Sequence, residues 1–229
     1  MGNVVLIRHG QASFGAADYD RLSPLGEEQS RRLGEWFRQT RQRPDLIATG
    51  SLLRHVRTAE LCVEAAAVDV PTVTMAGLNE LDHEDILARY RPDLDGVDAW
   101  RAELARGDNP HQAFQRLFAA AIDRWIGGEF DEQYTRSWPE FRADVLRALQ
   151  ELAMHTVGTI WAFTSGGPIA VIAQALVGAP ADNPLALSWP LVNTSLTRLS
   201  LGATRHSLVS YNSWPHLELT GEPRLVTHR

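Results

Sequence analysis

Three apolar runs in the sequence end in side chains that could bind and transfer a phosphoryl group. Arg8 and His9 follow the first run, Arg54 lies just beyond the second, and Glu80 lies beyond the third. The planar guanidinium group of an arginine can donate two hydrogen bonds to phosphate oxygens, and it stays charged near neutral pH. A histidine held between two arginines has a lowered pKa, so its neutral, nucleophilic form predominates. With a carboxyl group as general acid, the set predicts phosphoryl transfer through a phosphohistidine, with no metal and no other cofactor.

A fourth apolar run ends in Ser165 and Gly166, at the expected start of a helix whose backbone amides could bind an anion. Each of the four pieces is weak evidence by itself. An arginine early in a helix is usually an exposed surface residue, and Arg57 in the same helix is the residue with which Arg54 is compared. A glycine pair after a strand is often only a tight turn. Ligands in open α/β sheets bind beyond the carboxyl ends of the strands, so the joint placement of the pieces favours a site.

Alternating strands and helices must position these side chains. The alternation predicts an α/β fold with a largely parallel sheet, and a hairpin is expected near the end of the chain. Between residues 84 and 154 the pattern is helical, which predicts an insertion within one domain of residues 1–229. The expected strands are residues 4–7, 45–49, 70–75 and 157–164, and the expected hairpin joins residues 196–201 to 206–211.

Two helices carry the most detailed signals. The first spans residues 22–43, where Ser23 can cap it, Pro24 suits its first position, and arginines gather at its end. The second follows residue 51 and carries one apolar stripe, which predicts the buried face of that helix. The stripe consists of Leu52, Val56, Ala59, Val63 and Ala66.

The amino-acid composition argues against several classes of protein function. The 229 residues carry a formal net charge of −6 and 44% hydrophobic residues, as in a globular protein with a sizeable core. The negative charge gives no support for binding nucleic acid. Cys62 is the sole cysteine, which excludes an intramolecular disulfide. Without a targeting segment or an apolar run long enough to span a bilayer, a cytoplasmic protein with no membrane partner is expected.

With its motifs in this order, the sequence resembles the histidine phosphatase superfamily, in its phosphoglycerate mutase-like branch. The resemblance covers most of the chain and rests on "LIRHGQ", "LSPLGEEQ", "TGSLLRHVRTAE", "LNEL", "FTSGGPI" and "YNSWPHL". It implies a three-layer α/β/α sandwich around a mostly parallel sheet, with the helical insertion shaping the substrate pocket. It also implies a two-step hydrolysis of a phosphomonoester. His9 attacks phosphorus, Arg8 and Arg54 hold the phosphoryl oxygens, and Glu80 serves as general acid and then as general base.

The substrate-binding set that follows from the motifs is Arg8, Arg54, Gln11, Ser13, Ser165 and Gly166. One member departs from the family pattern, because a second histidine usually stands where this chain has Ser165. A neutral donor in place of a charged one should cost about 1–2 kcal/mol, or roughly tenfold in rate. Three interpretations stay open, in this order: a slower phosphatase, a histidine reaching in from elsewhere, or a binder of a phosphorylated ligand without turnover. The candidate histidines are His83, His206 and His216.

A second departure concerns the branch of the family. Mutases carry a serine and an asparagine just after Arg-His-Gly, whereas this chain has Ala12 and Gly15, with Ser13 displaced by one position. Hydrolysis is therefore favoured over mutase activity, and a phosphate-binding or regulatory protein is the alternative. The expected partner is a small phosphorylated substrate, with a phosphoprotein as the second choice. Trp189 and Trp214 are candidates for a homodimer interface.

Overall fold

The computed structural model describes residues 2–13, 20–94, 96–105, 109–155, 158–178, 184–202 and 205–228. Within these residues the chain divides into two compact units, residues 1–80 with 144–229 and residues 81–143. The sequence predicted a helical block at residues 84–154 inside one domain. The helix at the end of that block crosses the boundary, so its last residues belong to the first unit. Whether the block shapes a substrate pocket stays a prediction.

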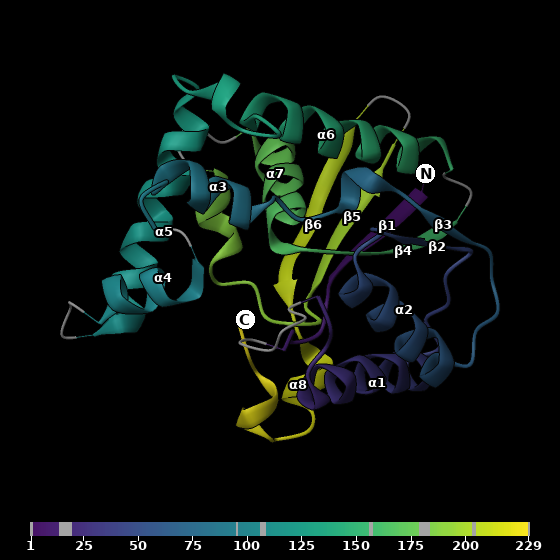
Figure 1. Ribbon diagram of the computed structural model, residues 1–229. Helices are drawn as coiled ribbons and strands as arrows, with labels where there is room; N and C mark the ends of the chain where they lie inside the picture. The colour runs from purple at the N-terminus through teal and green to yellow at the C-terminus, as the bar shows by residue number, and fades with distance from the viewer. Residues whose placement is uncertain are drawn as a thin grey trace. The chain divides into compact units, whose positions relative to one another are not determined.

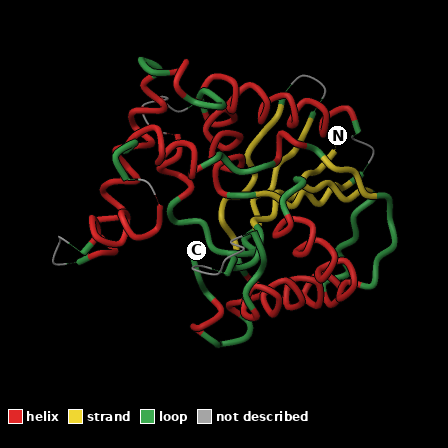
Figure 2. Tube along the Cα trace, in the orientation of Figure 1, coloured by secondary structure: helices red, strands yellow, loops and turns green. Residues whose placement is uncertain are grey.

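A six-stranded sheet forms the centre of the first unit, in the order β3-β2-β4-β1-β5-β6. The four strands β3, β2, β4 and β1 run parallel, β5 is antiparallel to β1, and β6 is antiparallel to β5. This pairing confirms the largely parallel sheet and the late hairpin. Figure 2 shows the strands of this sheet in yellow. The strands are β1 (Gly2–Arg8), β2 (Leu46–Thr49), β3 (Thr72–Thr74), β4 (Thr159–Thr164), β5 (Leu196–Leu201) and β6 (His206–Ser213).

Helices cover both faces of this sheet and make the expected α/β/α sandwich. Figure 1 shows α1 (Pro24–Gln39) and α2 (Leu53–Ala66) together on one side, with α7 (Gly166–Val177) on the other. Alternate side chains of a strand point to opposite faces, so Val5 and Ile7 of β1 pack in the core under α1 and α2. Phe37 of α1 stacks on Trp161 of β4, with ring centroids 3.9 Å apart.

The start of α1 matches its sequence signals, whereas its end does not. Ser23 is the N-cap and accepts a hydrogen bond from the Gly26 amide at 3.0 Å. The predicted helix continued to residue 43, but α1 ends at Gln39, so the last two of the three expected arginines lie beyond it. Arg41 adopts a left-handed backbone conformation with φ of 56°, which a continuing helix does not allow.

The second unit is helical. It contains α3 (His83–Tyr90), α4 (Gly96–Leu104), α5 (Pro110–Gly127) and the start of α6 (Trp138–Met154). Its core gathers the aromatic rings of Trp125, Trp138 and Phe141. The short elements of the chain are α8 (Pro215–Glu218), η1 (Ala76–Leu78), η2 (Asp131–Gln133), η3 (Pro184–Ser188) and η4 (Pro223–Leu225). Among helices in the described ranges, none is long and apolar enough to cross a membrane.

Candidate active site

The carboxyl ends of β1, β4 and β2 bring the first predicted residues together. Parallel pairing sets Arg8 opposite Thr164, and the His9 amide donates to the Thr164 carbonyl at 2.9 Å. His9 and Ser165 are therefore the next residues along two adjacent strands. On the other side of β4, the Gly50 amide donates to the Phe163 carbonyl at 3.1 Å, so β2 ends at the same edge.

His9 is held in the form that a nucleophile needs. Its side chain is buried, and Nδ1 lies 2.7 Å from the Gly10 carbonyl oxygen. A carbonyl oxygen only accepts, so Nδ1 must carry the proton, which leaves the lone pair on Nε2. Burial lowers the pKa of His9 well below its ordinary value, and the positive charges of Arg54 and Arg8 lower it further. The imidazole is therefore neutral at neutral pH and can attack through Nε2.

The two arginines reach this histidine from different elements. Arg8 ends β1 and donates through Nη1 to the Leu191 carbonyl. Arg54 is buried in the first turn of α2, and its Nη1 donates to Asp20 Oδ1 at 2.7 Å. The other oxygen of Asp20 accepts from the Leu53 amide at 2.7 Å. Asp20, which sequence reasoning missed, thus fixes both the start of α2 and its arginine.

Glu80 faces the start of α7. The Gly167 amide donates to both of its carboxylate oxygens, at 3.1 and 3.3 Å. This contact joins the segment after β3 to the first turn of α7, so two of the predicted stretches meet. The backbone amides at this helix start were expected from the sequence to bind an anion. One of them, the Gly167 amide, instead binds the carboxylate of Glu80.

The predicted substrate-binding residues Gln11 and Ser13 contact the polypeptide itself. Gln11 Oε1 accepts from the Ser23 hydroxyl at 2.8 Å, and Ser13 Oγ donates to the Leu22 carbonyl at 3.1 Å. Gly15 lies outside the described residues. Gly166 is the first residue of α7 and is buried.

The backbone of the nucleophile is fixed from the C-terminal part of the chain. The His9 carbonyl accepts from Asn193 Nδ2 at 3.1 Å, and the Thr194 amide donates to the Arg8 and His9 carbonyls at 3.1 and 3.3 Å. His216 Nε2 lies 2.8 Å from Thr194 Oγ1. His216 is therefore linked to His9 through Thr194.

Of the other two candidate histidines, His206 lies at the opposite end of the sheet. His206 begins β6 and pairs with Leu201, which pairs in turn with Gly2 at the far end of β1 from Arg8. His83 begins α3 in the second unit. Both residues were candidates to replace the missing histidine, and His206 is at the wrong end of the sheet for that role. The role of His83 stays a prediction.

The histidine that does approach is His55, which sequence reasoning overlooked. Its Nε2 lies 2.6 Å from Ser165 Oγ, and its ring centroid is 5.7 Å from that of His9. A signal was present in the sequence, because His55, Ala59, Cys62 and Ala66 repeat at helical spacing and are all buried. The predicted stripe instead included Leu52, Val56 and Val63, which are only half-buried, so the buried face of α2 was misplaced.

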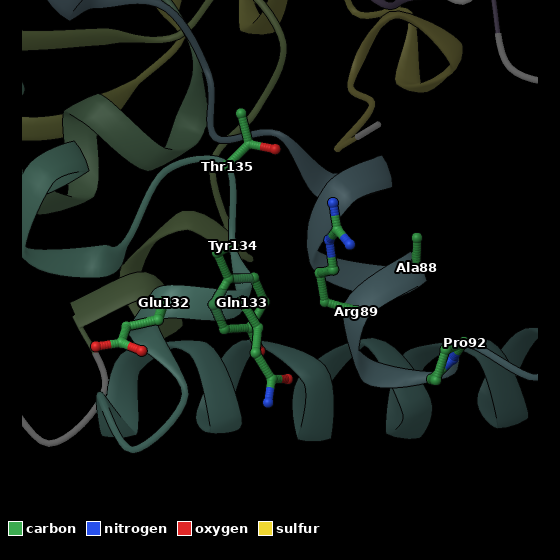
Figure 3. A pocket seen from close by; sticks show the side chains of 7 residues that line it. All are labelled: Ala88, Arg89, Pro92, Glu132, Gln133, Tyr134 and Thr135. Carbon is green, nitrogen blue, oxygen red and sulfur yellow. The ribbon is translucent and has the colours of Figure 1, made fainter.

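The remaining site features concern metals and cavities. Within the described ranges, no group of three or more His, Cys, Asp or Glu side chains is placed to hold a metal ion. A cavity of 510 Å³ lies in the second unit, and none of the catalytic candidates lines it (Figure 3). Its one cationic lining residue, Arg89, is paired with Asp85 at 3.1 Å. We therefore place the candidate active site at the ends of the strands.

Comparison with known proteins gives a consistent result. The sequence pattern of the histidine phosphatase superfamily (branch 1) matches residues 4–213. A 2,3-bisphosphoglycerate-dependent phosphoglycerate mutase from Thermobifida fusca is 29% identical over 168 residues, covering 65% of this chain and 64% of the relative. Phosphoglycerate mutase 1 from Saccharomyces cerevisiae is 29% identical over 126 residues, covering 52% of this chain and 47% of the relative. The matched regions thus span about half to two thirds of these relatives.

Two solved structures share the fold. A phosphoserine phosphatase from Entamoeba histolytica, in complex with phosphoserine, has a TM-score of 0.57 at 19% identity, covering 95% of this chain and all of that one (100%). A mycobacterial glucosyl-3-phosphoglycerate phosphatase has a TM-score of 0.56 at 24% identity, covering 93% of this chain and 99% of that one. At such identities the likeness shows the fold alone.

Proposed function

The chain belongs to the histidine phosphatase superfamily, branch 1, and from that premise we propose that it is a metal-independent phosphomonoester hydrolase. The observation that carries the proposal is the state of His9: buried, neutral, and with Nε2 left as the basic nitrogen by the contact between Nδ1 and the Gly10 carbonyl. A site that only bound phosphate would need the arginines, but it would need neither a nucleophile nor a general acid.

In the first step, Arg8 and Arg54 bind the oxygens of the phosphoryl group. The His9 Nε2 lone pair forms a bond to phosphorus while the bond from phosphorus to the ester oxygen breaks. Glu80 gives its proton to the leaving oxygen, so that the alcohol departs uncharged. The two guanidinium groups stabilise the charge that develops on the phosphoryl oxygens.

In the second step, the Glu80 carboxylate takes a proton from water while the water oxygen attacks phosphorus. The bond between phosphorus and Nε2 breaks, which returns His9 to its neutral form and releases inorganic phosphate. Glu80 ends the cycle protonated, as it began. The hydrogen bond from the Gly167 amide holds the carboxylate in one position for both proton transfers.

The substrate class that fits this scheme is a small phosphorylated molecule, with a phosphoprotein as the second choice. Mutases are among the relatives of this chain, but a mutase must also retain a bisphosphorylated intermediate. Gln11 and Ser13, the first polar side chains that follow the nucleophile in the sequence, form hydrogen bonds with Ser23 and Leu22. This favours hydrolysis over phosphoryl transfer between two hydroxyl groups.

Hydrolysis of an aryl phosphate in the presence of EDTA tests the proposal. The wild type should be active, His9→Ala should lose at least about a thousandfold in kcat, and His155→Ala should retain full activity because His155 is exposed at the end of α6. Quenched wild-type protein should carry an acid-labile phosphoryl group that His9→Ala lacks. Activity that survives in His9→Ala, or that EDTA removes, would contradict the mechanism.

A binding protein is the second candidate function, because Ser165 stands where the family pattern has a second histidine. Its signature would be affinity for inorganic vanadate or phosphate without turnover of any phosphomonoester. The same assay, repeated with a panel of sugar, nucleotide and amino-acid phosphates, separates the two functions.

A further inference from the structure

His55 and Ser165 form a buried pair beside the proposed nucleophile. Both side chains are fully buried, their Nε2 and Oγ atoms are 2.6 Å apart, and the His55 ring lies 5.7 Å from the His9 ring. The pair joins two elements, because His55 is on α2 and Ser165 ends the loop after β4. A contact this short between two buried polar groups fixes the position of both.

The direction of the Ser165 hydroxyl is unusual for its place in the fold. Ser165 is the N-cap of α7, where a serine normally accepts a hydrogen bond from an amide of the first helical turn. Here the side chain makes no such bond. The Gly167 amide donates to Glu80 instead, and the hydroxyl is turned to His55. The helix start therefore lacks its ordinary serine cap, and the hydroxyl is available for another role.

The space for the His55 ring is provided by a glycine. A Cβ on Gly50 would lie 2.2 Å from His55 Nδ1 and 2.6 Å from Asn79 Oδ1. Such distances do not occur, so any side chain at position 50 would displace the imidazole ring. Gly50 and His55 in the segment after β2 thus fit together with Ser165 in the segment after β4, which favours a built arrangement over a chance contact.

The tautomer of His55 decides what the pair can offer to a substrate. With the proton on Nδ1, Nε2 would accept the Ser165 proton, and the hydroxyl would have none left for an anion. With the proton on Nε2, His55 donates to Ser165 Oγ, and the hydroxyl proton is free to point elsewhere. Deprotonated phosphoryl oxygens only accept hydrogen bonds, so a bound phosphoryl group selects the second arrangement.

We propose that His55 is a positioning residue that donates from Nε2–H to Ser165 Oγ and thereby directs the Ser165 O–H to the phosphoryl group on His9. The inference rests on the proposed function and adds a residue to its site. In this arrangement a histidine on α2 and a serine before α7 together supply a directed hydrogen-bond donor at the position where the family pattern has a second histidine. His55 acts through the serine and does not itself touch the substrate.

A double-mutant cycle tests the pair in the full-length protein, with inorganic vanadate as the probe. H55A and S165A should each weaken vanadate binding about tenfold, as expected for a lost hydrogen bond to an anion. The double variant should lose no more than either single variant, because the two residues act as one unit. In the aryl phosphate assay, the same variants should lower kcat more than they raise KM, since the bond strengthens as charge develops.

Two further variants distinguish this role from a structural one. S165H alone should not restore a second histidine, because the larger side chain would collide with the His55 ring. H55A/S165H, in which the imidazole has moved to the other element, should return to within about threefold of the wild type in vanadate binding. H55Q retains an N–H donor at the end of its side chain and should fall between H55A and the wild type. The 15N spectrum of the vanadate-bound wild type should show the Nε2–H tautomer of His55.

The outcomes separate this inference from the proposed function. Additive losses of vanadate affinity in the double-mutant cycle would overturn the proposed role of the His55–Ser165 pair. Wild-type vanadate affinity in folded H55A would overturn it as well. Coupled losses in vanadate binding without any turnover would support the pair and overturn the hydrolase. Failure of the wild type to bind vanadate would overturn both. Thermal unfolding of each variant shows whether it is folded, and an Nδ1–H tautomer in the vanadate-bound wild type would contradict the proposal without any substitution.

Discussion

Arg54 and Arg57 lie three positions apart on one helix and have opposite surroundings. Arg54 is buried next to His9 and lowers its pKa. Arg57 is exposed and paired with Glu27 and Glu60, both at 3.2 Å. Exposed ion pairs of this kind contribute little to stability. The two side chains therefore form a matched pair for testing which charge serves the site.

Arg54→Ala should lower kcat/KM for an aryl phosphate by about 30-fold or more, which corresponds to the roughly 2 kcal/mol of a charged hydrogen bond. Arg57→Ala should leave kcat/KM within about twofold of the wild type. Steady-state kinetics of both variants, with their melting temperatures, check this. Equal losses in the two variants would show that Arg54 acts through overall charge and not through contact with the substrate.

At the residue scale, the sequence could predict the residues whose side-chain type and position along the chain indicate their chemistry. Arg8 and His9 after one strand and Arg54 after another are each weak evidence, but their joint placement at successive strand ends indicates an anion site. His55 and Asp20 could not be found in this way, because their roles depend on which residues lie opposite. His55 meets Ser165 across more than a hundred positions of sequence, and no local pattern encodes that contact.

At the scale of elements, the turn after β1 passes very close to the start of α1. A Cβ on Gly26 would lie 2.1 Å from the Gln11 carbonyl oxygen, and one on Gly10 would lie 2.4 Å from the Gly26 carbonyl oxygen. Both neighbours are backbone atoms, which cannot move aside as a flexible side chain can. The close approach of these two backbone segments holds the residues just after His9 against the start of α1.

Gly26→Ala should destabilise the protein by about 1–3 kcal/mol, as overpacking does, although alanine ordinarily favours a helix over glycine by about 1 kcal/mol. Gly127→Ala is the control, because the Cβ added in α5 meets nothing within 4 Å and should be neutral or stabilising. Denaturant unfolding of the two variants measures both free energies. A Gly26→Ala variant that is more stable than the wild type would show that the turn after β1 moves easily to make room for the added Cβ.

Element positions were predictable where the signal is local. Ser23 and Pro24 marked the start of α1 correctly, and strands of apolar residues were found at the right places, with ends that differ by a few residues. The end of α1 was missed because arginines are good helix formers, and they continue the pattern past Gln39. The signal against it was Pro44, which disfavours helical backbone in the residue before it.

At the scale of the whole molecule, three buried histidines make stability depend on pH. Burial is the largest cause that lowers the pKa of His9 and of His55 well below the ordinary value, and it lowers that of His216 to about 3. The unfolded chain exposes all three, where they titrate near the ordinary value of 6.5. Below that value the unfolded state binds protons that the folded state does not, so acid favours unfolding.

The free energy of unfolding should therefore be highest above about pH 7 and should fall as the pH drops below about 6.5. Each histidine that stays neutral in the folded state contributes about 1.4 kcal/mol per pH unit to this loss. Urea unfolding at about pH 7.5 and about pH 5.5 measures it. His216→Gln should reduce the slope, because it removes one of the three buried histidines. Equal stability at the two pH values would contradict the burial of all three.

The position of β1 in the sheet has a consequence for how the chain is made. β1 leaves the ribosome before the other five described strands of this sheet, but its neighbours are β4, which begins at Thr159, and β5, which begins at Leu196. At about 5–20 residues per second, its apolar residues wait on the order of ten seconds for either neighbour. The nascent chain thus carries an unpaired strand that can aggregate, and contacts between such distant segments form slowly. The nucleophile at the end of β1 is therefore synthesised well before the two strands that hold β1 in the sheet.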